Sequence, residues 1–384
     1  MDFHLPAELG RLQAEATEVA LASAETGDRG DDSWIIGHSR RFARELGRRG
    51  WIGMTWPRAE GGHGRPALER FVVFEALIAN GAPIASMWFA DRQMGPTLLR
   101  FGTPEQRRRF LPGIVAGTST WCIGMSEPDA GSDVAALRTR AERDGDDWVV
   151  SGHKLWTSGA ASADWCYLVA RTGSDAPRHA GLSELVVDMR AEGVSVAPIA
   201  DMTGDRHFCE VLFDRVRVPS ANLVGEVNGS FGQLMAQMEH ERGGIDRLVS
   251  NRMLYRDVLA SGLVDRRDRL VRQEIAALES GYRIGRLLVL RETLGQAPRG
   301  FSAATKTFCT EFEKRVAAFC ARVAGAHAVS WGAEPGPGGP GGPGGLGARI
   351  ARNICYAPAY TIMGGTSEIL RTVIGERVLG LPRS

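Results

Sequence analysis

The sequence predicts an α+β fold in which a strand-forming segment lies between two helical segments. Residues 1–118 carry apolar side chains at helical spacing, and residues 119–232 carry short apolar or alternating runs separated by turn residues. Helical spacing returns over residues 233–384, and 384 residues are more than one compact core usually holds. We therefore expect an N-terminal helical domain, a central β domain resembling a small barrel or sandwich, and a C-terminal four-helix bundle.

In the N-terminal segment, two helices are the most clearly marked. Residues 65–78 carry apolar side chains at helical spacing. Thr103 is a helix N-cap residue, Pro104 suits the first turn, and Gln106 completes a capping box. The sequence therefore predicts that a helix starts at Thr103.

The central segment reads as a series of short strands. Its apolar runs alternate with turn residues, as the strands of a small barrel or sandwich would. The predicted strands lie within residues 148–150, 165–170, 182–187, 194–199 and 209–218.

The C-terminal segment predicts helices over residues 233–261, 266–295 and 302–328, each long enough for an antiparallel bundle. Residues 333–347 then hold eight glycines and four prolines, a composition that cannot bury apolar surface. We expect a solvated linker there, with a functional lid as the alternative. A final helix is expected from Thr366 to about Leu379.

The composition argues against several classes of protein. A formal net charge of +1 gives no electrostatic footprint for nucleic acid or an anionic membrane. The most apolar window, residues 71–90, is interrupted by Glu75, Asn80 and Pro83, so we expect no membrane span. The six cysteines form no C-x-x-C pair, which predicts a reduced, cytoplasmic setting and no metal site.

A polar loop is expected early in the central segment. Residues 121–133 read WCIGMSEPDAGSD, and residues 154–158, KLWTS, follow about twenty residues later. Residues such as Pro128 and Gly131 favour turns over strands or helices. Such a loop offers amide N–H groups and hydroxyls to a planar heterocycle, with an indole beside the ring. An ordinary turn between two strands is the alternative.

These segments resemble a known family. Residues 126–160 begin SEPDAGSD, residues 363–371 read MGGTSEILR, and residues 375–382 read GERVLGLP. They resemble the central and C-terminal signatures of the acyl-CoA dehydrogenase family of flavoproteins. Weaker matches at 51–62, 101–106 and 222–226 extend the resemblance over nearly the whole chain. The resemblance implies the same order of helices, β domain and helices, with FAD as the cofactor.

The resemblance also implies a catalytic base. In this family a carboxylate removes the α proton of an acyl-CoA thioester while the β carbon gives hydride to flavin N5. Many members carry the carboxylate just before the Gly-Thr pair of the C-terminal signature, where this sequence has Gly364. A minority carry it in a Glu-Arg pair on the first long bundle helix, which Glu241 and Arg242 match. Glu241 is therefore the expected base, and a solvated charged face is the alternative.

Glu239 lies two residues before Glu241, which on a helix turns its side chain by about 200 degrees, so the two carboxylates cannot both face the centre of one pocket.

The resemblance also assigns positions to the flavin and to the substrate. The expected flavin contacts are Ile123, Met125, Ser126, Gly131, Ser132, Trp156, Thr157, Ser158, Thr366 and Glu368. The expected substrate contacts are Ser132, Glu239, Arg242, Gly364 and Gly365. Thr366 and Glu368 open a helix whose free N–H groups suit a pyrophosphate.

Two segments depart from the family pattern. Members usually carry an Arg followed by Phe-Gly on the second bundle helix and a glycine-rich motif later, both reaching the FAD of a neighbouring subunit. Here residues 268–273 read DRLVRQ and residues 323–327 read VAGAH. The chain therefore resembles the bacterial branch that forms mixed tetramers for sterol or other bulky acyl-CoAs. The missing side chain at Gly364 would leave volume for such a group.

The leading hypothesis is an acyl-CoA dehydrogenase that acts as a homo- or hetero-oligomer, a dimer or tetramer, and passes electrons to an electron-transferring flavoprotein. One alternative is a flavin oxidase or monooxygenase of the same fold that uses oxygen. Another is a non-catalytic or half-site subunit of a heteromeric enzyme, which Gly364 favours and Glu241 disfavours.

Overall fold

The structure is a computed structural model that describes residues 5–26, 29–173, 179–242, 244–298, 300–329 and 345–382, without the side chains of residues 26, 236 and 238–242. The chain divides into two compact units. The helical unit comprises Met1–Gly37, Pro66–Pro83 and Glu241–Ser384, and the sheet unit comprises His38–Arg65 and Ile84–His240. The domain boundaries predicted after residues 118 and 232 stay a prediction.

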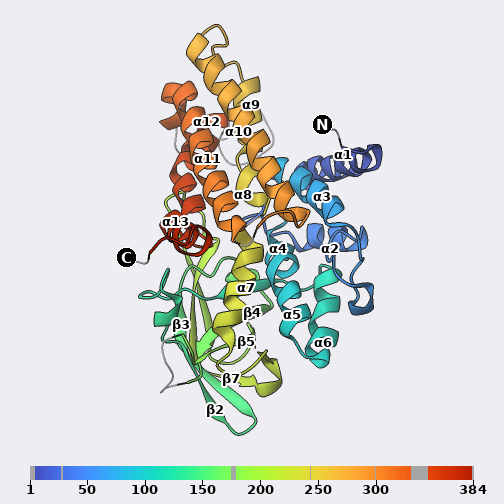
Figure 1. Cartoon of the computed structure of the whole chain (residues 1–384), viewed down its shortest axis with the longest axis vertical. Helices are drawn as coiled ribbons and strands as arrows, with labels where there is room; N and C mark the ends of the chain where they lie inside the picture. The colour runs from blue at the N-terminus through green and yellow to red at the C-terminus, as the bar shows by residue number, and fades with distance from the viewer. Residues whose placement is uncertain are drawn as a thin grey trace. The chain divides into compact units, whose positions relative to one another are not determined.

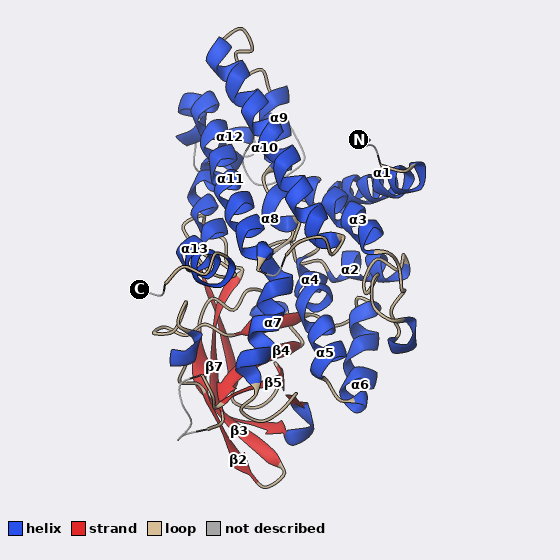
Figure 2. Cartoon of the chain, in the orientation of Figure 1, coloured by secondary structure: helices blue, strands red, loops and turns tan. Residues whose placement is uncertain are grey.

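Within the described residues, the strands form one eight-stranded sheet in the order β6-β7-β3-β2-β4-β5-β8, with β1 paired to β4 (Figure 2). The sheet is mostly antiparallel, and β1 runs parallel to β4. The strands are β1 Trp121–Gly124, β2 Arg140–Asp144, β3 Asp147–Lys154, β4 Trp165–Arg171, β5 Leu182–Asp188, β6 Val194–Ile199, β7 Phe208–Pro219 and β8 Leu223–Val224.

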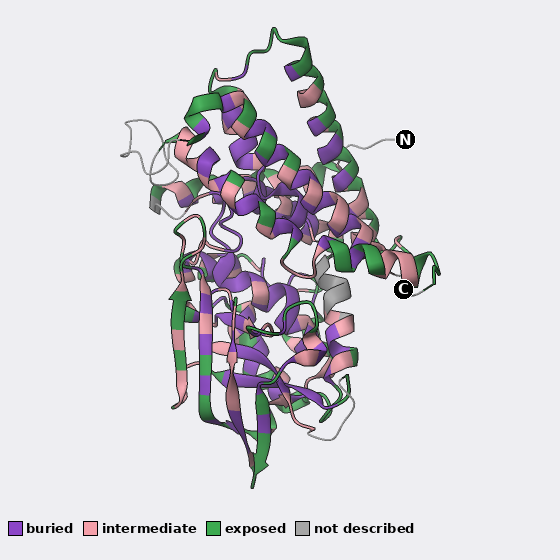
Figure 3. Ribbon diagram, turned by 90° about the vertical axis from the view of Figure 1, so that its left-hand side faces the viewer, coloured by how far each residue is buried: buried purple, intermediate pink, exposed green. Residues whose placement is uncertain are grey.

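Every predicted strand is present, because each run had the apolar or alternating pattern that a half-buried strand needs. Buried and exposed residues alternate along β7, as Figure 3 shows for the sheet. Strands β1, β2 and β8 were not predicted, and β1 occupies the first four residues of the segment 121–133 that was expected to be a polar loop. For β2 there is a physical reason. Its sequence, RAERD, buries only Ala141, so the backbone pairing with β3 rather than an apolar face holds it in the sheet.

Short helices complete the sheet unit: α2 Arg40–Arg48, α4 Ala85–Phe89, α5 Gly95–Phe101 and α6 Pro104–Val115. The predicted start at Thr103 is confirmed. The Thr103 hydroxyl accepts a hydrogen bond from the Gln106 amide at 3.2 Å, and Gln106 Oε1 accepts one from the Thr103 amide at 3.0 Å. The Gln106 side chain also donates to the carbonyls of Ala221 and Leu223, each at 2.7 Å, so the capping box anchors α6 beside β8.

The helical unit is built around α11, Phe301–Ala324, which packs against α8, α10, α12 and α13 (Figure 1). The predicted helix over residues 65–78 is α3. Among the described residues, no helix has both the length and the apolar character needed to cross a membrane. The other helices of this unit are α1 Ala7–Ala22, α3 Ala67–Ala79, α8 Asp246–Val249, α9 Arg252–Ala260, α10 Arg269–Thr293, α12 Leu346–Tyr356 and α13 Ser367–Val373.

The single helix predicted over residues 233–261 is wrong, because three shorter helices cover that window. Helix α7 spans Ser230–Arg242 and ends where the sequence has two consecutive glycines, and α8 and α9 follow. Glycine is a poor helix former, which explains the break. The final helix has the predicted extent, since α13 runs from Ser367 to Val373 and continues directly as a π-helix over Ile374–Val378, with Thr366 as the N-cap and Leu379 as the C-cap. Most of the glycine-rich segment 333–347 lies outside the described residues.

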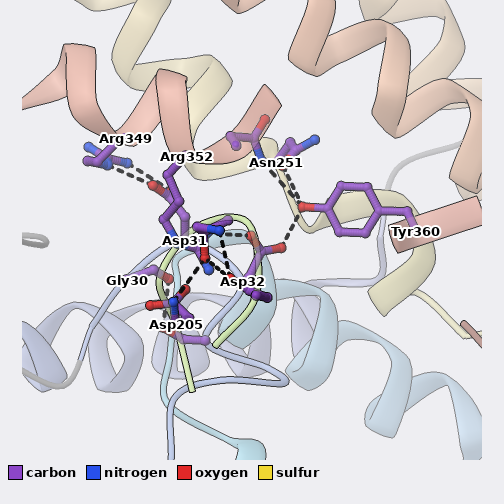
Figure 4. A network of polar contacts seen from close by, with 12 residues as sticks. Gly30, Asp31, Asp32, Asp205, Asn251, Arg349, Arg352 and Tyr360 are labelled. Atoms are coloured by element: carbon purple, nitrogen blue, oxygen red, sulfur yellow. Dashed lines mark hydrogen bonds and ion pairs between the residues drawn. The ribbon is translucent and has the colours of Figure 1, made fainter. Parts of the chain in front are cut away.

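A buried ionic network joins the N-terminal segment of the helical unit to α12 (Figure 4). Arg349 forms a two-bonded pair with Asp31 at 2.7 and 2.9 Å, and Arg352 donates to Asp32 at 2.9 Å. Tyr360 donates to Asp32 and to Asn251, the latter at 2.9 Å. The contacts made by Asp31 and Asp32 link residues more than 300 positions apart and explain why both ends of the chain belong to one unit.

Candidate active site

The structure brings the two central motifs together. The polar loop that follows β1 lies against the end of β3, where the Leu155 amide donates to the Ser126 carbonyl at 2.9 Å. Within the loop, Glu127 and Ala130 exchange two backbone hydrogen bonds, which close a tight turn. Met125 and Ser126 therefore lie beside the segment that carries Trp156. The loop and that segment both belong to the sheet unit.

A fully buried ion pair fixes this arrangement. The Lys154 ammonium lies 2.8 Å from Glu127 and donates to the Met125 carbonyl at 3.0 Å. Glu127 also accepts from the amides of Arg138 and Thr139 at 2.6 and 2.9 Å. Burial raises the pKa of Glu127, but Lys154 outweighs that effect and holds the pKa below its ordinary value. Burial lowers the pKa of Lys154, and Glu127 offsets part of that effect. The pair ties the loop to β3.

The residues after β3 present groups that suit a flat ring. Trp156 is 52% exposed, has a φ of 58°, and packs edge-on against Phe208 at 5.5 Å between ring centroids. The Thr157 amide donates to the Cys209 carbonyl at 2.9 Å, whereas its hydroxyl is buried without a hydrogen-bond partner. A buried unsatisfied hydroxyl is costly unless a ligand completes it. An exposed indole and an unsatisfied hydroxyl side by side therefore fit a bound heterocycle.

The remaining predicted flavin contacts of the sheet unit lie on β1, in the loop that follows it and after β3. Ile123 is partly buried on β1, and Gly131 and Ser132 are exposed at the far end of the loop. Ser158 is partly buried, and the next residue, Gly159, has a φ of 72°. These assignments stay predictions.

The helical unit carries the C-terminal signature as a glycine turn. Gly364 and Gly365 have φ angles of 68° and 92°, in the left-handed region that favours glycine. The Gly365 carbonyl accepts a hydrogen bond at 2.6 Å from Lys306, a fully buried side chain of α11. The left-handed backbone of the two glycines and the hydrogen bond from Lys306 therefore fix the conformation of this turn.

Thr366 caps α13, and its hydroxyl accepts from the Ile369 amide at 3.2 Å. Glu368 is exposed in the first turn and lies 3.9 Å from Arg371. The favourable contacts of that exposed carboxylate lower its pKa, first the hydrogen bond with its own backbone and then the one with Thr366. Neither position is tested as a pyrophosphate contact.

The expected base lies on α7. Glu239, Glu241 and Arg242 belong to the last turn of this helix, but their side chains lie outside those that the structure describes. The helix itself is well anchored upstream. Positions 230, 237 and 241 are spaced by seven and four residues, which places them along one stripe of the helix.

The anchor of that stripe is Glu184, a fully buried carboxylate on β5. It accepts hydrogen bonds from Tyr167, from Ser230 at 3.1 Å, from Gln233 at 2.9 Å and from Gln237 at 3.1 Å. Burial raises the pKa of Glu184 to about 7, although these four donors lower it. The carboxylate therefore fixes the position and rotation of α7 on the sheet.

We predict that Glu184 makes stability fall as the pH rises. Its folded-state pKa, about 7, lies above the ordinary value of 4.5, so the folded protein holds the proton more tightly than the unfolded chain. Stability is then lost as the pH rises from 4.5 to 7, by about 3 kcal/mol in total. Burial also raises the pKa values of Asp32 and Glu313, which remain in every variant, so urea unfolding across this range should show a loss about 3 kcal/mol larger in the native protein than in Glu184→Gln. The exposed control Glu142→Gln should follow the native protein, and parallel curves for all three would contradict the prediction.

Sequence reasoning missed the two buried carboxylates that hold the site in place. Glu184 interrupts an otherwise apolar strand, LSELVVD, and such an isolated charge is a usable signal. Lys154 and Lys306 are two of only three lysines among 46 basic residues, and both are fully buried against backbone carbonyls of site loops. Glu127 lies inside the recognised motif SEPDAGSD, but the sequence predicted no role for it. Within the described part of the chain, no group of three or more His, Cys, Asp or Glu side chains is placed to hold a metal.

Comparisons with known proteins find similar sequences and structures over most of the chain. Three family models match consecutive parts of the chain: the acyl-CoA dehydrogenase N-terminal domain over residues 5–118, the middle domain over 122–216 and the C-terminal domain over 231–379. The Acyl-CoA dehydrogenase IpdE1 of Mycobacterium tuberculosis is 35% identical over 351 residues, covering 90% of this chain and 88% of the relative.

Two solved structures are similar over the whole chain. The Tcur3481-Tcur3483 steroid ACAD has a TM-score of 0.87 and 32% identity, covering 100% of both chains. The ChsE4-ChsE5 complex from Mycobacterium tuberculosis has a TM-score of 0.85 and 31% identity, also covering 100% of both chains.

Proposed function

The chain belongs to the acyl-CoA dehydrogenase family of oxidoreductases, and we propose that it oxidises an acyl-CoA thioester between its α and β carbons, with Glu241 as the base. Glu241 takes the α proton, and Arg242 contacts the thioester's pantetheine region. Bound FAD supplies the acceptor for the hydride that leaves the β carbon. The other residues of the chain bind the substrate and the flavin and hold them in position.

The observation that carries the proposal is the pairing of the loop after β1 with the end of β3. The buried Lys154–Glu127 pair holds Met125 and Ser126 beside an exposed Trp156 and an unsatisfied Thr157 hydroxyl. We assign the flavin to these groups, together with the remaining predicted contacts at Ile123, Gly131, Ser132, Ser158, Thr366 and Glu368. The preorganised backbone amides of the loop orient the ring without moving when it binds.

Position 241 fits the role of base for a structural reason. It shares the α7 stripe of Ser230 and Gln237, which Glu184 holds in place, so the backbone that carries it is anchored. Gly364 has no side chain to compete for the proton. A precisely held carboxylate is what proton abstraction requires.

The substrate class and the partner form a further part of the proposal. We propose a bulky or ring-bearing acyl group, next to Gly364 and Gly365, with Ser132 and Glu239 also contacting the substrate. One similar structure is named a steroid ACAD, and another is named as a complex of two different chains. Turnover of linear acyl-CoAs alone would count against this substrate class.

We further propose a hetero-oligomer, since residues 268–273 and 323–327 lack the motifs that reach a neighbouring FAD, and an electron-transferring flavoprotein as the acceptor. All six cysteines are free, which fits a reducing compartment such as the cytoplasm.

The same departures favour a second candidate, a half-site subunit that supports a catalytic homologue. One experiment separates the two. The tagged chain is purified from cells that make its partners, and native mass spectrometry is combined with a flavin spectrum and an acyl-CoA turnover assay. We expect a mixed oligomer with FAD whose turnover depends on Glu241. Turnover that survives Glu241→Gln would favour the half-site subunit, and an active assembly without flavin would contradict both.

A further inference from the structure

A pocket of about 780 Å³ lies within the helical unit, and none of the residues that line it is a predicted site residue. Its walls come from α1, α3, α8, α9 and α10, and α3 packs against α1, α8 and α10. Its size falls in the ordinary range for small-molecule sites. Part of the wall is apolar, formed by Ala76 and Ala79 of α3 and by Leu248 and Val249 of α8.

Charge is distributed unevenly around this pocket. Four arginines and two glutamates line it, which leaves two positive charges in excess. Arg286 pairs with Glu75 through two bonds of 2.6 and 3.0 Å, and Arg252 pairs with Glu279 at 2.8 and 3.2 Å. Two arginines are therefore neutralised within the wall.

The other two arginines have no carboxylate partner among the described residues. Arg256 donates to the neutral oxygens of Ala79 and Asn80, and the side chain of Arg283 on α10 has no hydrogen bond or ion pair. Both guanidiniums are exposed. Guanidinium groups match the oxygens of phosphate and carboxylate in pairs, so two guanidinium groups that no carboxylate neutralises favour an oxyanion in this pocket.

An aromatic ring forms a further part of the wall. Tyr282 lines the pocket, and its ring lies under the Arg252 guanidinium, which is 4.3 Å from the ring centroid. The phenol oxygen itself is buried, so the ring rather than the hydroxyl is what Tyr282 offers to a ligand.

We infer that this pocket binds a small phosphate monoester with an apolar body. The doubly charged phosphate matches the excess charge of Arg256 and Arg283, and the body lies against Ala76, Ala79, Leu248 and Val249. The inference does not depend on the proposed function, because none of these residues belongs to the predicted active site.

The test uses the full protein and 2-naphthyl phosphate as the probe, in isothermal titration calorimetry. We expect saturable binding with one probe per chain. The parent alcohol 2-naphthol should bind more weakly because it lacks the phosphate. Inorganic phosphate should also bind more weakly, because it lacks the apolar body. Arg283→Gln and Arg256→Gln should each weaken binding about tenfold, the effect of losing one charged hydrogen-bond donor.

Arg272→Gln is the matched control, since Arg272 is an exposed arginine of α10 that does not line the pocket. It should leave binding unchanged, and thermal unfolding of each variant would confirm its fold. Equal binding by the native protein and the folded Arg283→Gln and Arg256→Gln variants would overturn the inference. So would the absence of binding, or displacement of the probe by an acyl-CoA, which would place it in the substrate site.

Discussion

Replacing Glu241 with Gln is expected to lower kcat by between about a hundredfold and ten-thousandfold, the usual contribution of a positioned general base. Glutamine keeps the size of the side chain and one acceptor oxygen but cannot take a proton. Flavin content, substrate binding and thermal stability should therefore stay close to those of the native protein. Steady-state turnover with an acyl-CoA and an electron acceptor gives the measurement.

The control for this substitution is Glu226→Gln, which neutralises an exposed carboxylate of the sheet unit. It should leave kcat unchanged, so that a general loss of negative charge is excluded as the cause. An enzyme that keeps its native turnover without the carboxylate at 241 would eliminate the assigned base.

The largest effect on stability is expected from Lys154→Met. Removing the ammonium leaves the Glu127 carboxylate buried without its charge partner, and breaking a buried pair in this way costs about 3–5 kcal/mol. The loop after β1 should loosen as well, because Lys154 also holds the Met125 carbonyl. Urea unfolding measures the first effect, and a weaker affinity for FAD measures the second.

The double variant Lys154→Met with Glu127→Gln should recover part of the lost stability, since it no longer buries an unpaired charge. The exposed pair of Arg140 and Glu142, 3.5 Å apart, provides the control, and Arg140→Met should cost less than about 1 kcal/mol. If Lys154→Met cost no more than Arg140→Met, the buried pair would not hold the loop.

The fold could be predicted wherever local pattern and burial coincide. Strands β3 to β7 have apolar or alternating faces, and Thr103 carries its own capping signal, so both were found from the sequence. Strand β2 could not be found in this way, because its charged residues are held by backbone pairing alone. The break after α7 was overlooked because the apolar spacing continues across two glycines that interrupt the helix.

The motifs predicted the residues of the candidate site, but they did not predict the buried side chains that hold those residues in place. Trp156 and Thr157 stand in a recognisable segment, whereas Glu184 is meaningful only through partners from β4 and α7 that are up to 53 residues away. Partners that a fold brings together cannot be read from local sequence. The sequence does show that Glu184 is a lone carboxylate in an apolar strand. In this chain that carboxylate holds α7 on the sheet.

The central claim is that position 241 drives oxidation of an acyl-CoA by bound FAD. Its most direct test mixes the assembled protein with a ring-bearing acyl-CoA in the absence of oxygen and follows the flavin absorbance by stopped flow. We predict that the oxidised flavin spectrum disappears in the native protein and that an enoyl-CoA forms, while the flavin of Glu241→Gln stays oxidised. Equally fast loss of the oxidised spectrum in that variant, or none in the native protein with any acyl-CoA, would contradict the claim.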